Sequence, residues 1–145
     1  KGSDEEVLKE LIIKEDLEES VHLKGFTSNI HDVYKNAMIH LSASHKESFG
    51  LTMVEAMSNS ILTASTKKTI GARYLIEDEK TGFLAPDNTV DDIFTLLSKI
   101  ISMIETKNPK LTSILENAYK HSQKFNADNI SKEWIQAIEN LTKKH

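Results

Sequence analysis

The sequence contains no cysteine, which excludes disulfide bonds and thiolate metal sites. Basic residues are not in excess either: 18 Lys and Arg stand against 22 Asp and Glu, giving a net charge of −4. A nucleic-acid-binding surface is therefore not expected. We find no apolar run long enough to cross a bilayer and no segment that resembles a signal peptide, so we expect no transmembrane segment and a cytoplasmic location.

Glycine and proline are scarce, with five and two residues, and the chain has no low-complexity segment or internal repeat. At 145 residues it has room for one domain with one core. Four short apolar segments predict strands, each bounded by polar or glycine-containing turns. These expected strands are 21–23, 38–43, 61–64 and 83–85.

Helical patterns occupy the stretches between the expected strands. Strands that alternate with helices predict an α/β fold, here a Rossmann-like parallel sheet with helices on its faces. We expect βα units over about 1–86 and a C-terminal helical part over about 87–145, together one domain. The expected helices are 4–14, 28–36, 51–58 and 71–76, followed by the three final helices 89–106, 109–124 and 128–143.

The most informative stretch is 38–64, which contains two carboxylates, Glu47 and Glu55, with seven residues between them. The segment 48–50 predicts a tight turn that opens the helix at Leu51. The first backbone N–H groups of such a helix are free, and the positive end of the helix dipole lies behind them, so the turn should attract anions, above all phosphates.

The two carboxylates suggest hydroxyl-bearing rings on both sides of that phosphate. Glu55 lies about one turn inside the helix, and its side chain should lean back toward the turn because helical Cβ atoms tilt toward the N-terminus. Glu47 precedes the turn and can accept hydrogen bonds on the other side. The pattern favours a sugar–phosphate–sugar ligand, although acidic residues near any helix start also complement its dipole on a solvated surface.

The segment 44–57, SHKESFGLTMVEAM, resembles the Glu-x7-Glu signature of the retaining glycosyltransferases of family 4, group 1 glycosyl transferases with the GT-B fold. Further matches occur in the family's order, and the resemblance spans about residues 2–95. Within this span the sequence departs from the family at Ala43, where the family often has Pro, and at 59–62, where it often has Gly-x-Pro-Val. The further matches are VHLKG at 21–25, ILTA at 61–64, Gly71-Ala72 and KTGFLAP at 80–86.

This resemblance implies specific roles for the matching residues. Glu47, the catalytic candidate, would contact the transferred sugar, and Glu55 would bind the ribose of the nucleotide. Gly25 and Phe26 match the loop beside the nucleobase, and Gly71 would approach the donor sugar. The diphosphate would be held mainly by backbone amides, with a possible hydroxyl from Thr52, over the segment Ser48, Phe49, Gly50, Leu51 and Thr52.

The resemblance implies that residues 1–145 are a partial nucleotide-sugar-binding domain from the C-terminal half of a GT-B fold. This would be the donor-binding part of a hexosyltransferase of polysaccharide or glycoconjugate biosynthesis. Such an enzyme moves a hexose from a nucleotide-diphosphate sugar, commonly a UDP-sugar, to a hydroxyl acceptor with retention of configuration. It also implies two earlier strands, with an Arg and a Lys for the diphosphate, and an N-terminal acceptor domain, through which peripheral membrane association is conceivable. Since these would precede Lys1, we expect this polypeptide alone to bind donor weakly and to transfer nothing.

Other interpretations remain open. A non-catalytic glycosyltransferase-like module could bind a partner protein through the sheet edge left open at 21–23. A flavodoxin-like signalling domain would need an acidic cluster at the first strand end, which the sequence does not show. The six histidines are scattered, so no metal or other cofactor is expected. His45 and Lys46 could reach a phosphate or acceptor, or be solvent-exposed loop residues.

Two apolar helices have rival interpretations as well. The helix containing residues 93–104 is apolar over more than one face, but it offers only Lys99 for a membrane surface, so we expect burial. Trp134 and its apolar neighbours are expected to pack in the core rather than to form a base-stacking platform.

Overall fold

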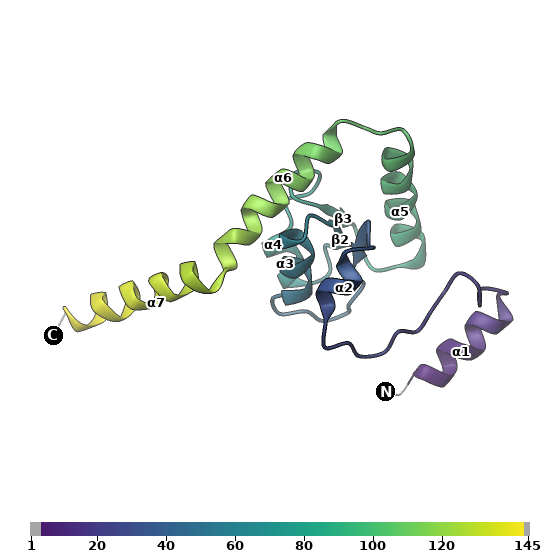
Figure 1. Ribbon diagram of the computed structural model, residues 1–145, viewed down its shortest axis with the longest axis horizontal. Coiled ribbons are helices and arrows are strands. Elements are labelled where there is room, and N and C mark those ends of the chain that lie inside the picture. The colour runs from purple at the N-terminus through teal and green to yellow at the C-terminus, as the bar shows by residue number, and fades with distance from the viewer. Residues whose placement is uncertain (1–3, 144–145) are drawn as a thin grey trace. The chain divides into compact units, whose positions relative to one another are not determined.

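The computed structural model describes residues 4–143. The chain divides into two units, one up to Val33 and one from Tyr34 onward, which are described separately. Figure 1 shows the order of the elements along the chain. The expectation of a single partial domain over 1–145 stays a prediction.

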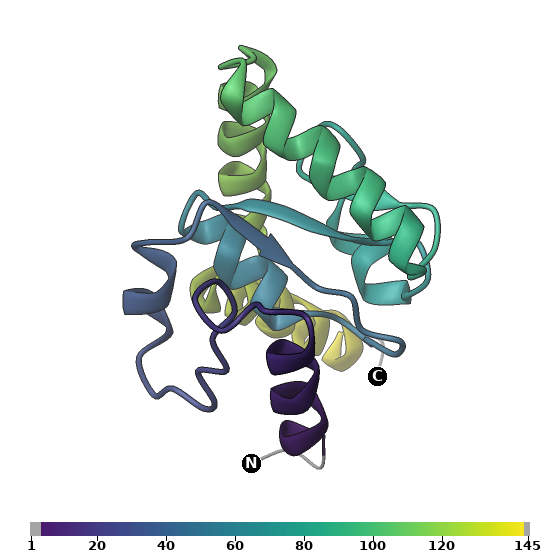
Figure 2. The same cartoon turned by 90° about the vertical axis from the view of Figure 1, so that its right-hand side faces the viewer.

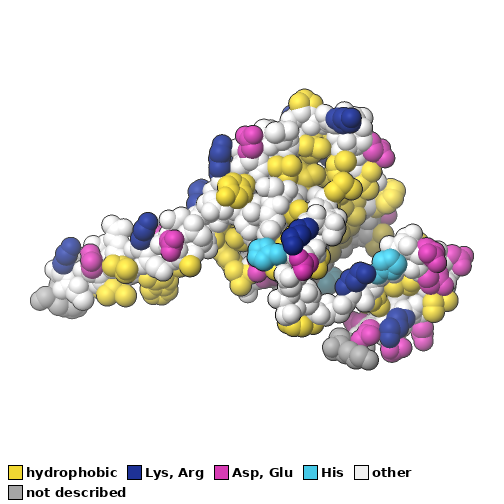
Figure 3. Space-filling view, in the orientation of Figure 1, with side chains coloured by type: hydrophobic (Ala, Val, Ile, Leu, Met, Phe, Trp, Pro, Cys, Tyr) yellow, Lys and Arg dark blue, Asp and Glu magenta, His cyan; other side chains and the backbone are white. Residues whose placement is uncertain are grey.

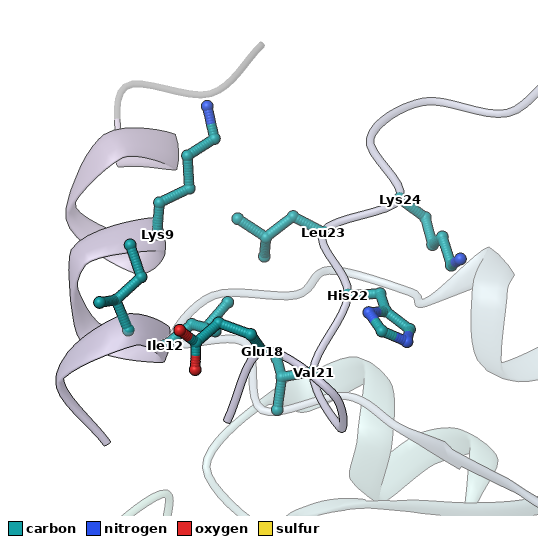
Figure 4. Close-up of a pocket in the computed structure, with 8 residues that line it drawn as sticks. Lys9, Ile12, Glu18, Val21, His22, Leu23 and Lys24 are labelled. Atoms are coloured by element: carbon teal, nitrogen blue, oxygen red, sulfur yellow. The ribbon is translucent and has the colours of Figure 1, made fainter. Parts of the chain in front are cut away.

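The N-terminal unit contains helix α1 (Glu5–Lys14) and most of helix α2 (Ile30–Tyr34). The prediction of a strand at 21–23 is wrong, because this segment has no regular secondary structure. A strand needs a hydrogen-bonded neighbour, whereas the amide of Val21 closes a local turn by donating to the carbonyl of Leu17 at 2.8 Å. Leu23 instead borders an open cavity of ≈ 450 Å³ beside α1 (Figure 4).

The second unit is built on a sheet of three parallel strands in the order β1-β2-β3. The strands are β1 (Ile39–Leu41), β2 (Leu62–Thr66) and β3 (Phe83–Ala85). Ile39 is opposite Leu62, and Ala64 is opposite Phe83. The α/β fold with a parallel sheet is thus confirmed, with β1 shorter than the expected 38–43.

Helices cover both faces of the sheet, as Figure 2 shows for α3 (Leu51–Ser58) and α5 (Val90–Glu105). Helix α4 (Ile70–Leu75) follows β2, and α6 (Lys110–Ser122) packs against α3. Strand side chains alternate between the faces, which produces two hydrophobic clusters. One contains Met53, Met57, Ala72, Leu75, Ile76, Leu84 and Ala118; the other contains Leu62, Ala64, Phe83, Ala85, Leu96, Ile100 and Ile114.

The three expected C-terminal helices are confirmed as α5, α6 and α7 (Ala127–Thr142), with a short 3-10 turn η1 (Gln123–Phe125) before α7. The expected burial of α5 is confirmed for one face only, since Ile100 is buried while Phe94 is 70% exposed. Within residues 4–143, no helix is long and apolar enough to span a bilayer.

The prediction that Trp134 packs in the core is wrong. Trp134 is 67% exposed, and α7 contains no buried residue. The reason is geometric: α7 leaves the layered part of its unit and projects away from it, with η1 as its principal neighbour (Figure 1). Hydrophobic side chains are consequently visible along α7 in Figure 3. Trp134, Ile138 and Leu141 are among the exposed apolar residues of this helix.

Candidate functional site

The loop that joins β1 to α3 begins at the carboxyl-terminal edge of the sheet. The amide of Ser42 donates to the carbonyl of Ala64 at 3.0 Å, which continues the ladder one residue beyond β1. The hydroxyl of Ser65 donates to the carbonyl of Ser42 at 2.8 Å. Both bonds fix the start of the loop at the edge where ligands of parallel α/β sheets bind.

Gly50 makes the turn from this loop into α3. It is the N-cap residue and has a left-handed backbone with φ +94°, a conformation that favours glycine. A Cβ at this position would overlap with the end of the Met53 side chain. The carbonyl of Gly50 accepts the amide of Met53 at 3.0 Å, so the helix begins directly after the turn.

Gly71 holds the other side of the loop. Its amide donates to the carbonyl of Glu47 at 3.2 Å. Gly71 lies in α4, whose cap is the Thr69 hydroxyl, and a Cβ on Gly71 would overlap with the backbone of Phe49. The structure therefore brings Gly71 against the loop 47–49, and its role toward a donor sugar stays a prediction.

Phe49 anchors the loop through aromatic packing. Its ring lies 5.4 Å from that of Phe125 and 6.2 Å from that of Tyr74, measured between ring centroids. Tyr74 and Phe125 also contact each other, and His121 packs edge-on against Phe125. The Phe49 side chain is thus committed to packing, which leaves its backbone as the part available to a ligand.

The amides of residues 48–52 point to the chemistry of the site. In the described part of the chain, no protein acceptor receives a hydrogen bond from any of these five N–H groups. Ser48, Leu51 and Thr52 are exposed, whereas Phe49 is partly buried and Gly50 is buried. The first turn of α3 contains no acidic residue, so the positive end of its dipole is not neutralised there. This arrangement can bind an anion.

The two carboxylates lie on elements that flank these amides. Glu47 is partly buried in the loop, and its Cγ would be 3.5 Å from a Cβ placed on Gly50. Glu55 is exposed on α3. Burial raises the pKa of the Tyr34 phenol, and the nearby charge of Glu55 raises this pKa further.

Two hydrogen bonds of the site, like the aromatic contacts of Phe49, were not predicted from the sequence. The Tyr34 hydroxyl donates to the carbonyl of Thr52 at 3.1 Å. The sequence signal for such a bond was a tyrosine within an aliphatic stripe, because a buried phenol needs a hydrogen-bond partner. His45 Nδ1 forms a hydrogen bond of 2.8 Å with the Asn88 side-chain nitrogen, so His45 ties the loop after β1 to the loop after β3. Lys46 is exposed.

Gly25 and Phe26 belong to the N-terminal unit. Gly25 has φ +65°, and no atom would come within 4 Å of a Cβ placed there. Phe26 is 95% exposed. Their place beside a nucleobase stays a prediction. Residues 4–143 contain no group of three or more His, Asp or Glu side chains that could hold a metal ion.

Comparisons with known proteins identify the family and the fold. The family model for glycosyl transferases group 1 matches residues 1–121. Over 140 residues the chain is 29% identical to poly(glycerol-phosphate) alpha-glucosyltransferase of Bacillus subtilis, covering 97% of this chain and 20% of that protein.

Solved structures share the fold. A glycosyltransferase from Rickettsia africae superposes with a TM-score of 0.87 at 23% identity, over 97% of this chain and 37% of that one. Anabaena HepE in complex with UDP superposes with a TM-score of 0.80 at 26% identity, over 94% of this chain and 38% of that one. The chain therefore spans between about a fifth and two fifths of the length of these relatives.

Proposed function

The chain belongs to the glycosyl transferases group 1 family, and from this premise we propose that it is the donor-binding part of a retaining hexosyltransferase. The donor is a nucleotide-diphosphate sugar, and the acceptor is a hydroxyl group. We place the enzyme in the cytoplasm, in the synthesis of a polysaccharide or glycoconjugate. The UDP bound to Anabaena HepE, 26% identical to this chain, supports a UDP-sugar as donor.

One observation carries the proposal: the amides of 48–52 have no protein acceptor among residues 4–143, and they lie at the start of α3. A diphosphate supplies the oxygens that these amides lack. Glu55, one turn further along α3, would accept hydrogen bonds from the ribose hydroxyls, and Glu47 would orient the transferred sugar. Gly71 and the loop containing Gly25 and Phe26 would complete the contacts to the sugar and the base.

The same amides would act in catalysis. As the glycosidic bond to the diphosphate breaks, negative charge grows on the leaving oxygens, and fixed N–H donors stabilise this charge more in the transition state than in the bound donor. A helix dipole amounts to about half a charge at its N-terminus, which is small against a diphosphate. We therefore propose weak donor binding, and no transfer, by this polypeptide alone.

A second candidate function is a non-catalytic module that binds a partner protein. The exposed apolar side chains of α7, including Trp134 and Leu141, favour it. The two candidates differ in ligand binding, because a module that has lost the donor site would show no saturable response to a nucleotide sugar.

An equilibrium titration of the 145-residue chain with UDP-glucose and with UDP tests the proposal. We expect saturable binding in the millimolar range, close to −4 kcal/mol at about 1 mM. Glu55→Gln should weaken UDP binding by about 10-fold, because it replaces hydrogen bonds to a charged partner, about 1.5–3 kcal/mol, with neutral ones of about 0.5–1.5 kcal/mol. Glu139→Gln on the exposed surface of α7 serves as the matched control.

The result that would contradict the proposal is a wild-type chain that shows no saturable response to either ligand. If Glu55→Gln and Glu139→Gln weakened UDP binding equally, Glu55 would not be part of the donor site. The donor site itself would not be contradicted by that result. Adding EDTA should not change the affinity for either ligand, since the proposed contacts use amides and carboxylates without a metal.

A further inference from the structure

Tyr34 stands apart from the other residues of α2 because its side chain is buried, with 5% of its surface exposed. Its ring packs edge-on against His40 of β1, with 6.2 Å between the ring centroids. The aromatic ring is thus held by the sheet, and the hydroxyl group at its tip is carried to a defined place.

That place is the first turn of α3. The Tyr34 hydroxyl donates to the carbonyl oxygen of Thr52 at 3.1 Å, across 18 positions of sequence. Thr52 is the second residue of α3, and its own amide is one of the five that lack a protein acceptor in the described chain. The bond therefore joins the C-terminal end of the amide segment to Tyr34 of α2, whose ring in turn packs against β1.

The other end of the amide segment is held by different contacts. Gly71 donates to the carbonyl of Glu47, and the ring of Phe49 packs against Phe125. These contacts fix residues 47–49, whereas Tyr34 reaches the segment at Thr52. A loop and a helix turn that must present N–H groups in one geometry need support at both ends, since a donor misplaced by a fraction of an ångström loses much of its hydrogen bond.

We infer that Tyr34 is a positioning residue for the donor site: its hydroxyl holds the first turn of α3 in the geometry that binds the diphosphate. This inference rests on the proposed function. Tyr34 also lies close enough to Glu55 for the charge of that carboxylate to raise its pKa, in addition to the effect of burial. The phenol therefore stays protonated at neutral pH and keeps its role as a donor.

Tyr34→Phe removes the hydroxyl and keeps the ring that packs against His40. We expect UDP to bind this variant between about twofold and tenfold more weakly, the range that corresponds to the net contribution of one neutral hydrogen bond. Amide resonances of the first turn of α3 should shift in the ligand-free variant. Tyr119→Phe, which removes an exposed hydroxyl from α6, is the control and should bind UDP as the wild type does.

Inorganic pyrophosphate separates a positioning effect from a general loss of structure. Pyrophosphate has no base and no sugar, so it would contact only the amide segment. Tyr34→Phe should therefore lower the affinities for pyrophosphate and for UDP by the same factor. The melting temperature should stay close to that of Tyr119→Phe. Unchanged UDP affinity in Tyr34→Phe, with a wild type that binds UDP, would overturn the inference alone. A wild type that binds neither ligand would overturn the proposed function and this inference with it.

Discussion

Gly71 determines how closely α4 approaches the loop before α3. Alanine normally stabilises a helix relative to glycine by about 1 kcal/mol. In Gly71→Ala, however, the new methyl group would overlap with backbone atoms of Phe49, and no side-chain rotation can relieve that overlap. We expect Gly71→Ala to lower the free energy of unfolding by about 1–3 kcal/mol, measured by chemical denaturation.

The matched variant is Ile70→Ala, one position earlier in α4, where the side chain is 70% exposed. It should change the free energy of unfolding by no more than about 0.5 kcal/mol. Stabilisation of the chain by Gly71→Ala would mean that helix propensity dominates and that the loop is free to move away from α4.

His40 gives the stability of the fold a dependence on pH. Burial lowers the pKa of His40 below its ordinary value of 6.5, and its Nε2 is a buried atom without a hydrogen-bond partner among the described residues. Below about pH 6.5 the unfolded chain takes up a proton that the folded chain does not. Stability is therefore complete above this pH and decreases as the pH falls from about 6.5 toward the lower folded pKa.

Denaturant unfolding at about pH 7.5 and about pH 5.5 measures this effect. His40→Leu removes the contribution of His40, so the loss of stability on acidification should become smaller. It should not vanish, because burial also lowers the pKa of His121. The assignment would be contradicted by a His40→Leu variant that loses as much stability as the wild type between these two pH values.

Among the elements, α5 and α7 show what an apolar pattern can and cannot predict. Both helices carry enough apolar residues to suggest packing, yet Ile100 on α5 is fully buried and Trp134 on α7 is exposed. The pattern identifies the apolar side chains of a helix, but only the path of the chain decides which of them meets another layer. Here α5 lies on the sheet, while α7 projects from η1.

This difference predicts that shortening an apolar side chain to alanine destabilises the fold much less on α7 than on α5. Trp134→Ala should change the free energy of unfolding by less than about 0.5 kcal/mol, whereas Ile100→Ala should lower it by about 2–5 kcal/mol. Denaturation followed by circular dichroism measures both. Trp134 is the only tryptophan, so its fluorescence should report a solvated indole that acrylamide quenches readily. A loss in Trp134→Ala equal to that in Ile100→Ala would show that α7 is covered in solution.

At the scale of the whole chain, local sequence predicted the second unit better than the first. Parallel strands at 62–66 and 83–85, the turn at Gly50 and the final helices follow from apolar runs, glycine and capping residues, and these patterns act within a few positions. The segment 21–23 has the composition of a strand, but pairing depends on a neighbour that local pattern does not reveal.

In the candidate site, too, the sequence predicted features formed by consecutive residues but not contacts between distant positions. The run from Glu47 to Glu55 identified the loop and the helix start, because both are consecutive in the sequence. The bond from Tyr34 to Thr52 and the aromatic contact between Phe49 and Phe125 join distant positions, so spacing alone did not predict them. The roles of Gly25 and Phe26 likewise stay predictions, since they lie in the other unit.

The central claim is that backbone amides 48–52 bind a diphosphate, and amide-resolved NMR of the chain during addition of UDP tests it most directly. We predict that the resonances of these five residues shift progressively and saturate together, while those of the outer turns of α7 stay in place. Addition of uridine, which has no phosphate, should leave the five resonances nearly unchanged. Saturable shifts elsewhere with none at 48–52 would contradict the account.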